Sequence, residues 1–298
     1  MKRFLKSLLV AVAVIPLAFT LVACGGDQLS SKADVDTKGK YQEVTIEDME
    51  TYATQSAKTS DEFNKGARLT LDVSYDGSKL SDLFGGLISS DSTATKTTAT
   101  MQINAIVRWT ITDNKASLNE LAYRSSATLN EKEMVADYYI KDNMEYVNAS
   151  YGDSKVQYKK AVEIASIGND SKSIATIESA GTQVNFAEVI GQLKANYVGK
   201  SNYAVVLEKA TSGKYTKWHF AVKQTKNGEE NVVLESYYVY KSNNLVGYTS
   251  MVNMGVMKVS CAVEAFDGTV KLPKGAEDYS TTVPTDAKWL TGIESIFG

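Results

Sequence analysis

The residues that most enzymes use for acid–base and nucleophilic chemistry are scarce in this chain, which has one histidine and two cysteines among 298 residues. His219 lies in an alternating stretch typical of a strand, on a face with Lys217 and Lys223 that we expect to be solvated. The sequence contains no Gly-x-Ser-x-Gly elbow, no Gly-x-x-x-x-Gly-Lys loop and too few ligands for a zinc site. We therefore expect no enzyme activity, metal or cofactor; a hydrolase that works with carboxylates alone is the alternative.

The N-terminus has the pattern of a secretory signal. Three basic residues within the first six precede an uncharged apolar run from Ser7 to Ala23. The run leads into Leu21-Val22-Ala23-Cys24, which resembles the lipobox of bacterial lipoproteins. The resemblance implies that residues 1–23 are a signal peptide, and that a diacylated Cys24 then anchors the protein on the extracytoplasmic side of the bacterial cell membrane. The alternatives are an uncleaved transmembrane anchor and cleavage without lipidation.

The charge of the mature chain excludes one class of partner. Without residues 1–23 the chain has 29 basic and 35 acidic residues, a formal charge of −6. This acidic balance argues against nucleic-acid binding, which needs a basic face. Because Cys24 is assigned to the lipid, Cys261 has no disulfide partner, and its alternating neighbours predict a small buried side chain in a strand.

Hydropathy divides the mature chain into a tether and one folded domain. Residues 24–44 are polar and aperiodic, and we expect a flexible tether that spans about 25 Å as a random coil. Residues 45–298 are expected to form a single domain, which opens with a helix capped by Thr45 and reaching to about Asn64.

Period-two alternation then predicts about eleven strands, nearly all in hairpin order, with a turn at Asp142-Asn143 and a last short strand over 269–272. Further helices are expected over 161–167 and 171–180, after a cap at Asn185, and after Pro284. Strands in hairpin order with helices set apart predict an α+β fold, built on a large meandering antiparallel sheet with helices at its start, middle and end.

One amphipathic segment interrupts the strands. Apolar residues recur at helical spacing over residues 80–88, among them Phe84 and Leu87, between glycines and a Ser/Thr-rich run that ends at Thr100. This segment is predicted to be a lid over a cavity, a flap that touches the membrane, or an element packed permanently on the sheet.

Several strands are apolar on both faces, which indicates that both faces are covered. In residues 232–240, Tyr237 and Val239 alternate with Tyr238 and Tyr240. A sheet with one face in water needs only one apolar face. The second face is therefore covered by helices, or part of it lines a hydrophobic cavity.

The order of lipobox, tether, helix, many antiparallel strands and inserted helices resembles the LolA/LppX-like lipoprotein carriers. The hairpin sequence over residues 139–148, Tyr-Ile-Lys-Asp-Asn-Met-Glu-Tyr-Val-Asn, is similar to one in Gram-positive lipoproteins of this type. The resemblance covers residues 45–298 as topology. It implies an unclosed barrel whose concave face is covered by helices, with a cavity for acyl chains between sheet and helices.

These observations predict a membrane-anchored lipoprotein that binds or carries a hydrophobic ligand, a lipid or an acyl chain. The candidate lining residues are aromatic or apolar: Trp109, Trp218, Phe220 and Tyr238, with Phe84 and Leu87 on the lid. The alternative is a cell-envelope interaction or sensor module that presents a sheet surface to a protein or glycan. The burial of three tyrosines distinguishes these two functions: Tyr237, Tyr238 and Tyr240. A carrier would bury them beside a void, whereas an interaction module would expose them in a patch.

Overall fold

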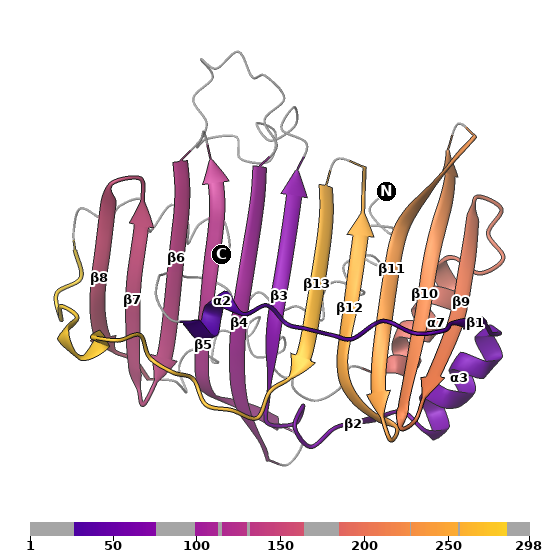
Figure 1. Ribbon diagram of the computed structural model, residues 1–298, viewed down its shortest axis with the longest axis horizontal. Coiled ribbons are helices and arrows are strands. Elements are labelled where there is room, and N and C mark those ends of the chain that lie inside the picture. Colours follow the sequence, from indigo (N-terminus) through magenta and orange to yellow (C-terminus); the bar gives the residue numbers. More distant parts are fainter. Residues whose placement is uncertain are drawn as a thin grey trace.

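The computed structural model describes residues 27–75, 99–112, 115–129, 132–163, 185–226, 228–255 and 257–284. The described part is dominated by one sheet of thirteen strands, with few helices (Figure 1). The strands are β1 (Gln42–Glu43), β2 (Lys58–Thr59), β3 (Gly66–Tyr75), β4 (Ala99–Thr112), β5 (Lys115–Leu129), β6 (Lys132–Lys141), β7 (Met144–Tyr151), β8 (Ser154–Ala161), β9 (Tyr203–Ser212), β10 (Tyr215–Lys226), β11 (Glu229–Lys241), β12 (Asn244–Asn253) and β13 (Met257–Ala265).

Two meanders lie side by side to form the sheet. One runs from β3 to β8 and the other from β9 to β13, and β13 pairs with β3 in antiparallel register. β8 lies at one end of the strand order and β1 at the other, so the described sheet is unclosed. The predicted antiparallel meander is confirmed, and so is the turn at Asp142-Asn143, where both residues have positive φ as a tight hairpin requires.

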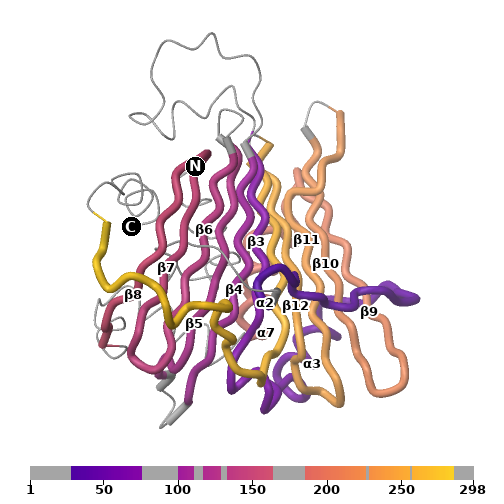
Figure 2. Tube along the Cα trace, turned by 60° about the vertical axis from the view of Figure 1, so that its left-hand side comes forward, coloured from indigo at the N-terminus to yellow at the C-terminus, as the bar shows by residue number. Residues whose placement is uncertain are grey.

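The two faces of the sheet carry different elements. Helices α3 (Ile46–Gln55) and α7 (Phe186–Asn196) lie behind β9 to β11 in Figure 1, and we call this the helix face. The opposite face is crossed by residues 27–44, which we call the strap (Figures 1 and 2). We call this second face the strap face; it also carries the short helix α2 (Asp27–Ser30) and, after β13, a segment that includes the 3₁₀ turn η2 (Ala276–Asp278).

Local capping signals fix where the two longer helices begin. The Thr45 hydroxyl accepts a hydrogen bond from the Asp48 backbone N–H at 3.1 Å, and Asp48 Oδ2 accepts one from the Thr45 N–H at 2.9 Å. The Asn185 side chain accepts a hydrogen bond from the Glu188 N–H and so caps α7, and both predicted starts are confirmed. The prediction that α3 reaches about Asn64 was wrong, because the chain leaves the helix after Gln55 and forms β2 against β12.

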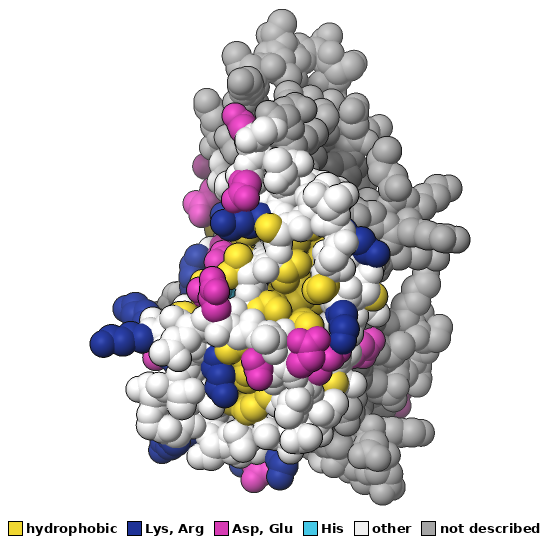
Figure 3. Space-filling view, turned by 90° about the vertical axis from the view of Figure 1, so that its right-hand side faces the viewer, with side chains coloured by type: hydrophobic (Ala, Val, Ile, Leu, Met, Phe, Trp, Pro, Cys, Tyr) yellow, Lys and Arg dark blue, Asp and Glu magenta, His cyan; other side chains and the backbone are white. Residues whose placement is uncertain are grey.

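Helical cover of the sheet is seen only at one end of the described structure. Lys194 of α7 pairs with Glu50 of α3 at 2.8 Å, and the two helices pack together over β9 to β11. The predicted helices over 171–180 and after Pro284 lie outside the described residues, and Ala161 ends β8 instead of starting a helix. Figure 3 faces the β9 end of the sheet, where apolar side chains reach the surface among lysines and acidic residues.

The prediction of a flexible tether over residues 24–44 was wrong for the part that the structure describes. Residues 27–44 are docked along the sheet from β5 to β9, and their last residues form β1 against β9. The residues predicted as a strand over 269–272 form none; Val270 packs instead with Leu29 and Ile106 on the strap face. No helix in the described ranges is long and apolar enough to span a membrane.

Candidate functional site

Three of the four described candidate lining residues meet under the helices. Trp218 and Phe220 of β10 and Tyr238 of β11 point to the helix face, because alternate residues of a strand share a face. The Phe186 ring of α7 lies 4.9 Å from Tyr238, and the Tyr52 ring of α3 lies 5.1 Å from Trp218, centroid to centroid. These contacts make an aromatic cluster closed by helix side chains.

The strand residues of this cluster are buried. Trp218 is 1% exposed and Phe220 2% exposed, and burial raises the pKa of Tyr238 far above its usual value. Trp109 is buried elsewhere, on β4, where its backbone N–H donates to the Lys65 carbonyl. The cavities described below are lined by none of these four residues. The predicted lid residues Phe84 and Leu87, and Cys24, lie outside the described residues.

A second part of the helix face differs from the aromatic cluster by having small side chains. Ser125 of β5 stands opposite Ala136 of β6, which stands opposite Ala149 of β7. All three are buried, and on one side they are bordered by the next row of large residues, Tyr123, Tyr138 and Val147. We call this row of three small, buried residues the depression, because their side chains are shorter than those of the neighbouring row.

The hydroxyl of Ser125 gives this depression one polar atom. It is buried, and among the described residues it has no hydrogen-bond partner. A buried polar atom without a partner costs roughly 1–3 kcal/mol unless a water or a ligand satisfies it. A water or a polar ligand group at this position would therefore gain a hydrogen bond to Ser125.

A row of residues that are polar except for one alanine crosses the strap face. Each stands directly opposite the next on the neighbouring strand, and the row crosses the sheet from β9 to β8. In that order its members are Glu208, His219, Tyr237, Thr249, Ala262, Thr70, Asn104, Arg124, Asp137, Asn148 and Gln157. Sequence reasoning could not find this row because it depends on the register of every strand pair.

His219 lies between two carboxylates in this row. Its Nδ1 is 2.7 Å from Glu208 Oε2 and its Nε2 is 3.2 Å from Glu235 Oε1. The ring stacks on Tyr237 at 4.2 Å, and the strap residue Tyr41 meets it edge-on at 5.8 Å. Both nitrogens are engaged, so the arrangement positions the imidazole and leaves neither nitrogen free to act as a base.

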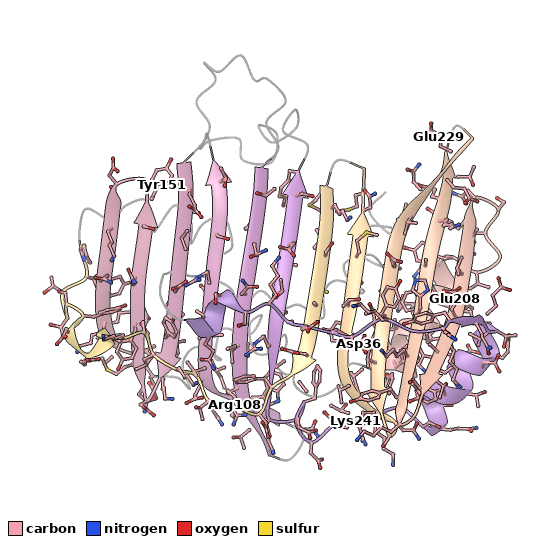
Figure 4. The ribbon with its side chains drawn as sticks, viewed as in Figure 1. Asp36, Arg108, Tyr151, Glu208, Glu229 and Lys241 are labelled. Carbon is pink, nitrogen blue, oxygen red and sulfur yellow. The ribbon has the colours of Figure 1, made fainter. Side chains whose placement is uncertain are left out.

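The expectation that Lys217 and His219 are solvated was wrong, because the strap covers both. Lys217 is 5% exposed, and its Nζ donates to Asp36 Oδ2 at 2.6 Å and to the Lys38 carbonyl at 2.7 Å. Figure 4 shows Asp36 on the strap in front of the sheet. Burial, and then the carboxylates nearby, raise the pKa of Tyr41 to about 12.

The buried carboxylate of Asp137 is a second electrostatic feature of the row. The guanidinium of Arg124 donates two hydrogen bonds to it, at 2.6 and 3.0 Å. Burial nevertheless raises the pKa of Asp137 to about 7, and the Arg124 contacts only partly oppose that rise.

Three cavities open on the strap face beside the strap. One of about 450 Å³ lies above it and includes Asp72, Gln102 and Lys258, and one of about 280 Å³ includes Tyr237 and Thr249. A third of about 600 Å³ lies below it, between the strap and the β11–β12 turn. Polar and apolar side chains together line them.

The tyrosines chosen to separate the two predicted functions divide between the faces. Tyr238 and Tyr240 are buried in the aromatic cluster, whereas Tyr237 is half-buried beside the cavity of about 280 Å³. Cys261 is buried in β13 as predicted, and burial raises the pKa of its thiol to about 12, which keeps it protonated and unreactive. No family model matches the chain, and no curated protein matches it.

Proposed function

We propose that this protein is a membrane-anchored extracytoplasmic lipoprotein whose domain binds a hydrophobic ligand, a lipid or an acyl chain, on the helix face of its sheet. The observation that carries the proposal is the extent of that face. Its buried apolar side chains run from β10 to β8, whereas α3 and α7 lie over β9 to β11 only. An apolar surface wider than its described helices is suited to an apolar ligand.

The proposed ligand position is the depression formed by Ser125, Ala136 and Ala149, and not the aromatic cluster. The cluster around Trp218 and Tyr238 is filled by Phe186 and Tyr52, so it serves as the packed end of the domain. An acyl chain in the depression would fill the space beside Tyr123 and Tyr138. A polar group at its end would satisfy the hydroxyl of Ser125.

The proposed anchor is the diacylated Cys24. Two acyl chains are enough for stable attachment to a bilayer, whereas one gives only marginal binding. The proposal thus combines membrane attachment, which the lipobox implies, with an apolar binding surface. It includes no catalytic step. The LolA/LppX-like carriers combine the same two features, and the unclosed antiparallel sheet supports the resemblance at the level of architecture.

Binding of a fluorescent fatty acid tests the proposal. The chain from Gly25 onward is titrated with the probe, and unlabelled fatty acid is then added as a competitor. Saturable binding of about one probe per protein, reversed by the competitor, is the expected result. Absence of saturable binding would contradict the carrier function.

The cavities of the strap face favour a second candidate, an interaction module without an internal ligand. These three cavities open beside the strap, and polar side chains such as Asp72, Glu235 and Asp36 contribute to their linings, as on a surface that contacts a protein or glycan. The titration separates the candidates, since a module of this kind leaves the acyl probe unbound.

A further inference from the structure

We propose that the strap fixes the orientation of the domain, so that the strap face over β4 and β5 lies against the membrane surface. This inference rests on the proposed lipid anchor at Cys24. The sequence predicted a domain that turns freely on a long tether. In this proposal the N-terminal segment is docked on the domain, so the domain cannot turn freely.

The strap is held most firmly where it begins. Leu29 is 1% exposed and packs with Ile106, Tyr139 and Val270 on the strap face. The side chain of Gln28 donates to the Thr269 carbonyl at 2.9 Å and accepts from the Lys271 N–H at 2.8 Å. The packing of Leu29 and the two hydrogen bonds of the Gln28 side chain therefore fix the first turn of the strap, which lies over β4 and β5.

Contacts continue along the strap to the far edge of the sheet. The Ala33 N–H donates to Thr70 Oγ1 at 2.8 Å, Asp36 pairs with the buried Lys217, and Gln42–Glu43 pairs with β9. Gly247 gives the strap room, since a Cβ there would lie 3.1 Å from a methyl group of Val35. Because residues 27–44 are docked along the sheet, they cannot also act as a flexible linker between the lipid and the domain.

The remaining length sets how far the domain can lie from the bilayer. Between the acylated Cys24 and the docked helix α2 there are only residues 25 and 26, and this stretch of chain reaches about 10 Å when fully extended. A free tether of residues 24–44 would span about 25 Å and would let the domain rotate. The short link places the strap face next to the lipid headgroups.

The charges of the strap face are compatible with that position. Five of its cations form ion pairs on the same face, which interleaves positive and negative charge: Lys32 with Asp72, Arg68 with Glu264, Arg124 with Asp137, Lys141 with Glu120, and Lys217 with Asp36. The helix face is then directed away from the bilayer, on the side from which a partner or ligand would approach.

Fluorescence quenching in vesicles tests the orientation. The full lipidated protein is placed in phosphatidylglycerol–phosphatidylethanolamine vesicles whose headgroups carry a nitroxide quencher. A fluorophore is attached to Ser31→Cys on the exposed start of the strap or, as the matched control, to Ala195→Cys on the exposed side of α7. Cys261 is buried and Cys24 is acylated, so neither competes for the label.

We expect quenching at residue 31 to be several-fold stronger than at residue 195. In the double variant Gln28→Ala, Leu29→Asp, which removes the contacts at the start of the strap, the difference should shrink while the protein stays on the vesicles, and faster amide exchange at Ala33 should show that this part of the strap is released. Equal quenching at both sites in the unaltered strap would overturn the orientation alone. Protein recovered in the soluble fraction would overturn the proposed anchor, and the inference with it.

Discussion

At the scale of single residues, Asp137 gives the protein a specific pH dependence. Its pKa is about 7 in the folded state, above its usual value of 3.8, so between these pH values the folded state holds a proton that the unfolded state has lost. Stability contributed by this group should therefore fall as pH rises from about 4 to 7 and level off above. Chemical denaturation across this range should show the decline, and Asp137→Asn should flatten it. A stability that rises through this window, with the Asn variant following the same curve, would contradict the assignment.

Lys217 is the buried residue that contacts the middle of the strap. Lys217→Met keeps the apolar stem but removes two hydrogen bonds from a charged donor, so we expect a loss of about 1–2 kcal/mol in unfolding free energy. Lys223→Met is the matched control, because this lysine lies on the same strand and face but makes an exposed pair with Glu230. The control should change stability by less than about 0.5 kcal/mol. Equal effects of the two variants would mean that the strap contact contributes nothing of its own.

At the scale of elements, the depression across β5, β6 and β7 is the part of the helix face that a ligand should need. Ala149→Leu fills it, and we expect about tenfold weaker binding of an acyl probe, with a stability change of about 1–3 kcal/mol or less. Ser150→Leu places the same side chain on the strap face of the same strand and should leave probe affinity unchanged. Equal losses in the two variants would place the ligand elsewhere.

Periodic elements could be predicted from the sequence, and the strap could not. Alternation revealed the strands, and a hydroxyl or amide followed by an acid revealed the caps at Thr45 and Asn185. Residues 27–44 have no period because their partners, such as Thr70 and Lys217, come from distant strands. For the same reason, the alternation within this strand predicted solvated side chains for Lys217 and His219, because it carries no information about the strap that covers them. The small-residue depression was equally hidden, since Ser125, Ala136 and Ala149 become neighbours only through strand register.

At the scale of the whole molecule, the sheet separates two tasks by face. The strap face carries a row of mostly polar residues and a small apolar cluster, is crossed by the chain's own N-terminal segment, and is placed toward the membrane in our proposal. The helix face is apolar and offers the surface for a ligand. Because both meanders share one sheet through β13 and β3, the strap spans the two halves and ties them into one unit.

Native mass spectrometry with solvent extraction tests the central claim most directly. The chain from Gly25 onward is purified from bacterial cytoplasm without detergent and weighed intact, before and after incubation with lipid. We predict a mass that exceeds the chain by one lipid or fatty acid, recovered in the extract at about one per protein. A clean mass of the chain alone, with no uptake of added lipid, would contradict a hydrophobic ligand site on the helix face.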